Sequence, residues 1–410
     1  MTLYLLIKRF FRVLPPPAAM VFTREPLMQR FWGSGVLFMV TGFGLGLWLW
    51  LQQQGWPVAP SWLGDSWQPR SVHAGWQVIY FSSAFLLGFA LQAGPHLLGS
   101  PPPPLLPALR LLGLLLLGWL LSWIPDATVG IVSQLVTAAS LLWAVGLLVI
   151  MVRSGLPAHM AGIGLPLAAG IAWLAVAVWL PLEQPRWGMW ALWLGPMTVI
   201  LAAAQQLIAN VLGGQRLVGR AGVGFALLLT LCWGLTTLAA VADHDHSWRL
   251  AGLIWLITLL WYWVKTNLWQ ALRQTGWQSI TLALACGLTA PLLTALWLLL
   301  AGGVDLDRMI HLLALGAVVP LILAVAARVT TFFSGGYVLP EPWLMVVLGL
   351  WLGVVLLRVL PPLPAAAIHL DGWLPAVVVV IVLLLGVWIN GLVRRLWVIH
   401  TRARAMRGQS

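Results

Sequence analysis

Charged residues and cysteines are scarce in this chain. Of its 410 residues only 8% are charged, against 61% hydrophobic, whereas a soluble domain carries about a quarter of its residues charged. This composition excludes a soluble globular protein and indicates a chain embedded in a lipid bilayer. The two cysteines, Cys232 and Cys286, stand singly in apolar stretches, which excludes a disulfide framework and a Cys-x-x-Cys site.

Acidic residues are also rare, and their positions exclude most enzymatic chemistry. The 10 Asp and Glu residues fall in expected loops or near the ends of apolar runs, so we expect no carboxylate pair within the membrane. The sequence also lacks a Ser-His-Asp grouping, a nucleotide-binding glycine loop and a His-Glu-x-x-His motif. We therefore do not expect an enzyme, and the lack of buried acids argues against a proton-coupled transporter.

Long apolar runs are what the chain has in abundance. A helix needs about 20 apolar residues to cross about 30 Å of hydrocarbon. Many of the 28 tryptophans fall near the ends of such runs, as in an interfacial aromatic belt. The sequence predicts an all-α integral membrane protein, a bundle of twelve transmembrane helices at residues 34–51, 71–93, 105–124, 128–152, 159–182, 187–212, 222–242, 249–267, 279–302, 311–333, 342–361 and 372–395.

The distribution of charge predicts the orientation of these helices. With the N-terminus in the cytoplasm, most of the 22 Lys and Arg residues lie inside and most of the acidic residues lie outside. Both termini are therefore expected in the cytoplasm. We expect residues 1–30 to form an amphipathic segment on the inner leaflet, 31–395 the twelve-helix domain, and 396–410 a basic tail. The net charge of +12 thus indicates anionic lipids of the inner leaflet as the partner, and not nucleic acid.

Polar residues inside the apolar runs are the candidates for function. His73, Gln77 and Tyr80 recur at helical spacing along the second run, with Ser83 close beside them. Hydrogen bonding between helices explains Gln77, Tyr80 and Ser83 without a ligand, and the alternative is that they line a cofactor site. His73 and His311 each open a run that is expected to point inward, so both are expected at the outer surface.

Two blocks of the sequence resemble the NnrS family of polytopic membrane proteins, which is associated with the response to nitric oxide. Residues 72–95, VHAGWQVIYFSSAFLLGFALQAGP, match the family's His-Ala opening and its later Gly-Phe and Pro. Residues 311–330, HLLALGAVVPLILAVAARVT, look like its His-x-x-x-x-Gly-Ala helix, which ends in Arg-Val. The resemblance implies a multi-pass protein of the bacterial cytoplasmic membrane that binds haem b, copper or both and acts in the nitric oxide response or denitrification-related stress.

The resemblance also assigns candidate residues. It implies that His73 and His311 are ligands, either as the axial pair of one haem or on a copper ion. Arg328 cannot share that site, because seventeen helical residues, about 25 Å, separate it from His311. We expect Arg328 either to reach the inner headgroups or to form an inner anion site, for a haem propionate or a transported anion, beside Gln206 and Asn210.

The chain departs from the family pattern at several positions where a ligand would be expected. The residues that stand in place of family His, Glu, Met or Arg are Gly75, Trp76, Gln77, Gln206, Leu284 and Phe333. Fewer ligands than usual are therefore expected here.

A second candidate metal site lies in ADHDHSW, residues 242–248. His244 and His246, together with two carboxylates, could bind Cu(II) or Zn(II). The alternative is a solvated loop in which Ser247 caps the next helix.

Two further functional classes stay open. Twelve helices permit a secondary transporter, although the residue identities show no convincing internal repeat. The departures from the family pattern favour a non-catalytic membrane scaffold or assembly subunit. Nitric oxide would be a ligand, a signal or only the context in which the protein is made.

Overall fold

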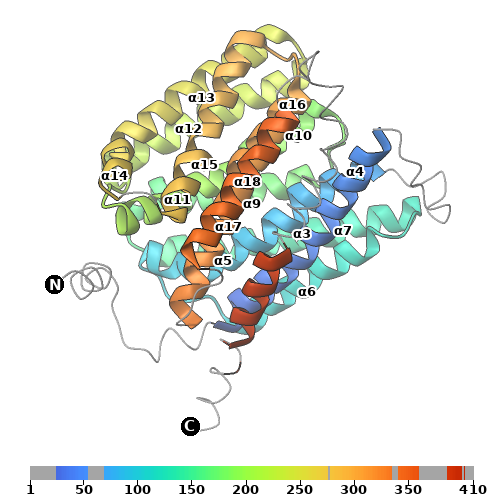
Figure 1. The fold of residues 1–410 in the computed structure, drawn as a ribbon, viewed down its shortest axis with the longest axis horizontal. Coiled ribbons are helices and arrows are strands. Elements are labelled where there is room, and N and C mark those ends of the chain that lie inside the picture. Colours follow the sequence, from blue (N-terminus) through green and yellow to red (C-terminus); the bar gives the residue numbers. More distant parts are fainter. Residues whose placement is uncertain are drawn as a thin grey trace.

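The computed structural model describes residues 25–53, 69–275, 278–334, 340–359, 386–398 and 401. Within these ranges the chain is helical and contains no strand. The helices pack side by side in one bundle (Figure 1). The expected amphipathic segment, except for its last few residues, and most of the expected basic tail lie outside the described residues, so both stay predictions.

The described residues contain nine helices that are long and apolar enough to cross a membrane, together with two shorter apolar helices. Together they correspond to the first eleven predicted runs. The twelfth run, 372–395, begins outside the described residues and shows a helix from residue 386. Five of the long spans are single α-helices: α3 (Glu25–Gln53), α7 (Ala127–Ser154), α12 (Gly219–Ala242), α13 (Asp245–Lys265) and α15 (Ser279–Ala301). The other four contain a π-helical segment: α4–η2–α5 (Pro69–Gly75, Trp76–Phe81, Ser82–Leu98), α8–η3–α9 (Pro157–His159, Met160–Gly164, Leu165–Ala177), α10–η4–α11 (Pro185–Leu192, Trp193–Met197, Thr198–Val211) and α16–η5–α17 (Leu306–Leu313, Ala314–Val318, Val319–Ser334). The two shorter apolar helices are α6 (Leu105–Leu121) and α18 (Glu341–Val359).

One short helix has no counterpart among the predicted runs. Helix α14 (Leu268–Thr275) follows α13 and is amphipathic. The Arg273 guanidinium lies 4.4 Å from the ring centroid of Trp269. Trp269 is exposed, as expected for an indole and a cation that share the interfacial region of a bilayer.

Four of the long spans contain a π-helical segment, η2 to η5. A π turn takes a backbone carbonyl away from its usual partner four residues later, and in an apolar bundle that carbonyl needs another donor. In each segment a side chain supplies it. The donors are Ser82 Oγ to Gln77 O (3.1 Å), Gln205 Nε2 to Gly162 O (2.8 Å), Thr198 Oγ1 to Trp193 O (3.2 Å) and Trp351 Nε1 to Leu315 O (2.7 Å).

Three of the π segments mark an internal repeat of the fold. Segments η2, η4 and η5 begin at Trp76, Trp193 and Ala314, at nearly equal intervals along the chain. The packing that follows η2 and η4 also repeats, because α6 packs on α7 as α12 packs on α13, and α7 packs on α9 as α13 packs on α15. The repeat thus lies in helix geometry and packing, which explains why residue identities did not reveal it.

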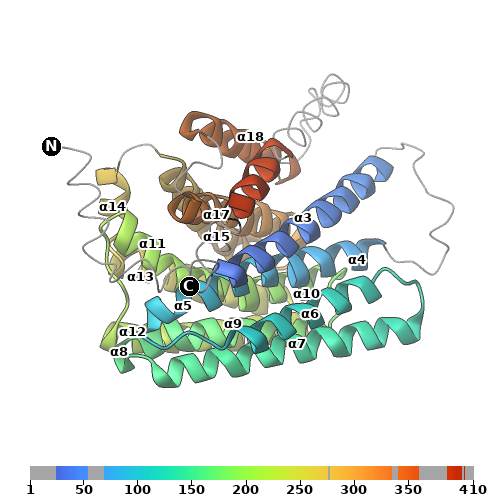
Figure 2. The same ribbon diagram turned by 90° about the horizontal axis from the view of Figure 1, so that it is seen from below.

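The helices surround a core formed largely by the spans that contain η2, η4 and η5. Helices α17 and α18 lie on the side of the bundle opposite α7 and α8 (Figure 2). The expectation that tryptophans form an interfacial belt holds only in part. The fully buried side chains include six indoles, at Trp32, Trp76, Trp193, Trp248, Trp255 and Trp388, because large rings fill the spaces between inner spans that smaller side chains would leave empty.

Candidate functional site

His73 and His311 lie at the same end of the bundle, which we call the histidine end. It is formed by α4, by α16, by the part of α3 around Gly42 and Gly46 and by the last residues of α18 (Figure 1). His73 is close enough to His311, Asp307 and Arg358 for Coulombic interaction with each of them. The structure therefore brings together two histidines that are far apart in the sequence.

The imidazole of His73 is held against helix α3. Its Nδ1 lies 2.9 Å from the backbone carbonyl oxygen of Gly42. A carbonyl can only accept, so Nδ1 carries the proton, and in the neutral ring Nε2 keeps its lone pair. Gly46 makes this contact possible, since a Cβ at that position would lie 2.5 Å from His73 Cε1.

His311 has the same arrangement but a different partner. Its Nδ1 lies 2.7 Å from the backbone carbonyl oxygen of Asp307, one turn earlier, and 3.6 Å from Oδ1 of the same residue. Arg358 Nη2 donates to the other carboxylate oxygen of Asp307 at 2.6 Å. This ion pair ties α18 to α16 beside the histidine, and the proton of His311 is again on Nδ1.

Gln77 lies one turn after His73 and faces α3. A Cβ on Gly42 would lie 2.3 Å from Gln77 Nε2, which shows how closely the amide packs against that helix. Gln77 Nε2 is buried and has no hydrogen-bond partner among the described residues. A buried amide donor without an acceptor is unusual, and here it lies next to the candidate ligand His73.

Tyr80 points away from the two histidines. Its hydroxyl lies 2.9 Å from Thr137 Oγ1 and 3.4 Å from Ser133 Oγ, both on α7. The π segment η2 inserts an extra residue between His73 and Tyr80, so the regular helical period used to place them on one stripe does not apply. The hydroxyl of Tyr80 thus hydrogen-bonds between helices.

The inner site expected around Arg328 has one of its members already engaged. Arg328 belongs to α17, and its side chain lies outside the described part of the structure. Asn210 Oδ1 accepts a hydrogen bond from Arg216 Nη2 at 3.0 Å. Gln206 Oε1 is buried and has no partner among the described residues. An anion site here stays a prediction.

The residues of the His244 and His246 loop take part in packing contacts. Asp243 pairs with Arg186 at 3.1 Å, and Asp245 Oδ1 accepts from the backbone N–H of Gly303 at 3.0 Å. Both histidines are exposed. Across the described ranges, no group of three or more His, Cys, Asp and Glu side chains is placed to hold a metal ion.

The expected helix cap in this loop is wrong. Helix α13 begins at Asp245, with His244 as its N-cap residue. Ser247 therefore lies inside the first turn, and its hydroxyl donates to the carbonyl of His244 at 2.6 Å.

Four residues of the histidine end escaped the sequence analysis. Gly42 and Gly46 form a Gly-x-x-x-Gly pattern in α3. This pattern is a known signal for close helix contact, so the two glycines could have been found from the sequence. Asp307 and Arg358 were placed outside but not recognised as a pair, because they come from helices whose packing the sequence does not reveal.

The comparison with known families identifies the chain. The family model described as NnrS protein matches residues 28–399, which is most of the chain. No curated protein matches it.

Proposed function

The chain belongs to the NnrS family of membrane proteins, and we propose that it binds haem b or copper through His73 and His311 and acts in the response to nitric oxide. We further propose twelve spans with both termini in the cytoplasm of a bacterium, contacts with anionic lipids of the inner leaflet, and no catalytic activity. The observation that supports a cofactor site is the convergence of His73 and His311 at one end of the bundle.

The orientation of the two rings suits a ligand role. Histidines that bind a metal usually donate the proton of their other nitrogen to a carbonyl or carboxylate, which fixes the tautomer. Both rings do so here, to Gly42 and Asp307. Two imidazoles are a sufficient donor set for the axial positions of a haem iron and also suit copper.

The surrounding charges favour haem over a bare copper ion. Arg358 lies beside His311, and Arg70 is close enough to Asp307 to interact with its charge. The carboxylate of Asp307 balances one of these two charges, and the positive charge that remains opposes a divalent cation but suits the carboxylates of a haem. The unpaired amide of Gln77 would also be satisfied by an acceptor atom on a bound group. When bound, haem iron would supply redox and gas-binding chemistry.

The test is an absorption spectrum with metal analysis of the purified protein, produced in cells supplied with haem and copper. We expect a Soret band in the wild type that is lost in His73→Ala and in His311→Ala. His159→Ala is the matched control, because its Nδ1 also lies 2.7 Å from a backbone carbonyl oxygen, that of Leu97, away from the site. A colourless, metal-free wild type would refute the proposal, and copper without a Soret band would assign the site to copper.

A secondary transporter is the second candidate, and the repeat supports it. Internal repeats are typical of transporters, and the spans that contain η2, η4 and η5 recur at nearly equal intervals along the chain. A colourless protein that exchanges a labelled substrate in proteoliposomes would favour this function. A colourless protein that instead co-purifies with a partner complex would favour a scaffold or assembly subunit.

A further inference from the structure

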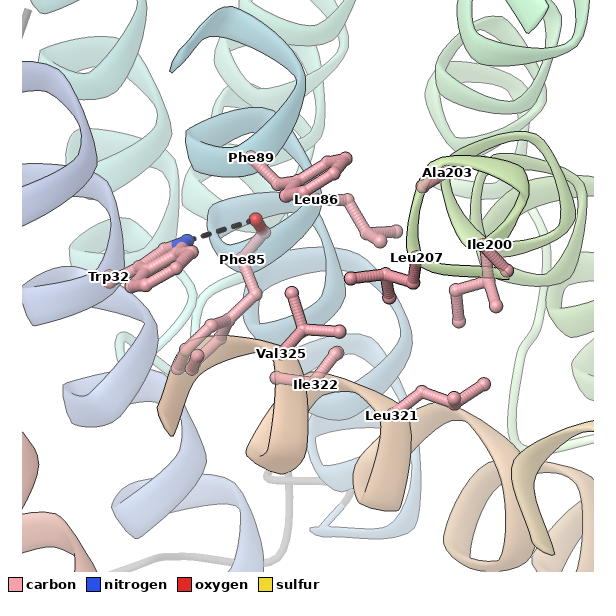
Figure 3. A pocket seen from close by; sticks show the side chains of 12 residues that line it. Trp32, Phe85, Leu86, Phe89, Ile200, Ala203, Leu207, Leu321, Ile322 and Val325 are labelled. Carbon is pink, nitrogen blue, oxygen red and sulfur yellow. Dashed lines mark hydrogen bonds between the residues drawn. The ribbon is translucent and has the colours of Figure 1, made fainter. Parts of the chain in front are cut away.

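A cavity that is partly open at one side lies between helices of the bundle, in the half away from the histidine end. Its volume is about 50 Å³, and apolar side chains of α3, α5, α11 and α17 line it (Figure 3). The larger ones include Trp32, Phe89, Ile200, Leu207, Leu321 and Val325. Three of these four helices belong to the equivalent spans of the repeat, so the cavity lies where the three repeats meet.

The space exists because small and rigid residues line it. Ala203, Ala204 and Ala326 stand at the wall, where larger side chains would fill the gap. Trp32 cannot turn inward to fill it. Its Nε1 donates to the backbone carbonyl of Phe85 at 3.2 Å, and its ring stacks on the Phe85 ring with the centroids 6.0 Å apart.

The backbone of α5 also locks Trp32 in place. A Cβ at Gly88 would lie 2.7 Å from Trp32 Cδ1, so the indole occupies a slot that only glycine leaves open. Because the indole is fixed by a hydrogen bond, by stacking and by this slot, the cavity does not close by a simple side-chain rotation.

The apolar lining of the cavity determines which molecules can bind there. The lining residues are apolar, and the indole N–H of Trp32 is already bonded. A buried water needs two to four polar partners, whereas apolar cavities stay dry and accept apolar guests such as xenon. An ion would lose its hydration without compensation. The lining therefore suits an uncharged apolar molecule, and the volume of about 50 Å³ suits a small one.

We propose that the cavity binds a small uncharged molecule of the diatomic gas class. Nitric oxide is the gas of this class that the proposed function involves, and the identification of the bound gas as nitric oxide rests on that function. Such molecules concentrate in hydrocarbon, and the helices that line the cavity include spans long and apolar enough to cross a membrane. Helices α5 and α17 continue into the segments that carry His73 and His311. Phe85 follows His73 by twelve residues, about 18 Å of helix, so a bound gas would lie within the two spans that hold the histidines.

Xenon is the probe, and the full-length protein in lipid nanodiscs is the sample. We expect 129Xe NMR to show a saturable protein-bound signal that empty nanodiscs lack. Ala203→Leu places a larger side chain in the cavity and should abolish the signal. Ala209→Leu, on the same helix but outside the cavity wall, is the matched control and should retain it.

A second variant keeps the test decisive if Ala203→Leu does not fold. Leu207→Ala enlarges the cavity and should increase the bound xenon. A wild type without a bound signal, or a signal that neither variant changes, would overturn the proposal. Xenon that binds only after lipid extraction would also overturn it, because an acyl chain would then occupy the space. His73→Ala should bind xenon like the wild type, which separates this result from the fate of the cofactor proposal.

Discussion

Replacing Gly46 with alanine tests whether helix α3 holds the His73 ring by close contact. The new Cβ would lie 2.5 Å from His73 Cε1, which is shorter than real Cβ contacts allow, and 3.1 Å from Nδ1, which is tighter than most of them. The ring must therefore move, and its 2.9 Å hydrogen bond to Gly42 must weaken. Gly44→Ala is the matched control, because a Cβ at Gly44 meets nothing within 4 Å.

The two variants should differ in stability by an amount that can be estimated. Forcing an extra methyl into a packed contact costs about 1–3 kcal/mol, and the weakened hydrogen bond costs about 1 kcal/mol. Exchanging glycine for alanine in a helix returns about 1 kcal/mol in both variants. Gly46→Ala should therefore be less stable than Gly44→Ala by about 2–4 kcal/mol.

Thermal unfolding in detergent, followed by tryptophan fluorescence, measures this difference. Gly46→Ala should unfold several degrees below Gly44→Ala, and Gly44→Ala should unfold at or above the wild-type temperature. If the two variants unfold together, the contact between α3 and His73 is not as close as described. The His73 ring would then not be fixed by contact with α3.

Three further variants test other contacts by the same unfolding measurement. The buried amide of Gln205 bridges two backbone groups, since it donates to the carbonyl of Gly162 and accepts from the N–H of Leu217. Gln205→Leu leaves both groups unpaired and should cost about 2–4 kcal/mol. Gln206→Leu removes an oxygen that has no partner among the described residues and should cost less than about 1 kcal/mol; equal losses would contradict the bridge by Gln205. Arg358→Ala breaks the ion pair with Asp307, and with side chains 31% and 57% exposed the loss should be about 0–1 kcal/mol; a larger loss would mean that the pair is more buried than described. Trp351→Phe removes the donor to the π segment η5 and should cost about 1 kcal/mol; no loss would show that the carbonyl has another donor.

Most helices could be predicted from the sequence because span length follows from bilayer thickness. The predicted ends of the helices were less accurate, because helices continue past the hydrocarbon. Helix α3, for example, begins at Glu25, nine residues before the predicted start. Helix α14 is too short and too polar for a search by apolar run. The π segments could not be predicted, because each depends on a donor from elsewhere, as the Leu315 carbonyl depends on Trp351.

The candidate site was predictable to a similar degree. Topology alone placed His73 and His311 at one end, because both were expected near the start of runs that point inward, and each lies within the first two turns of a span that begins at Pro69 or Leu306. The orientation of Tyr80 was not predictable, since it depends on η2. The contact between Asp307 and Arg358 joins α16 and α18, and only their packing reveals it.

The internal repeat has a consequence for how the protein is made. Three residues before η2, η4 and η5 stand His73, Trp190 and His311. The middle copy thus carries an indole, which donates to Thr237 Oγ1 and cannot ligate an ion. A group shared by the two imidazoles would therefore depend on the first and last thirds of the chain. During synthesis, such a group would be captured only after the tenth span had left the ribosome and joined the second in the membrane.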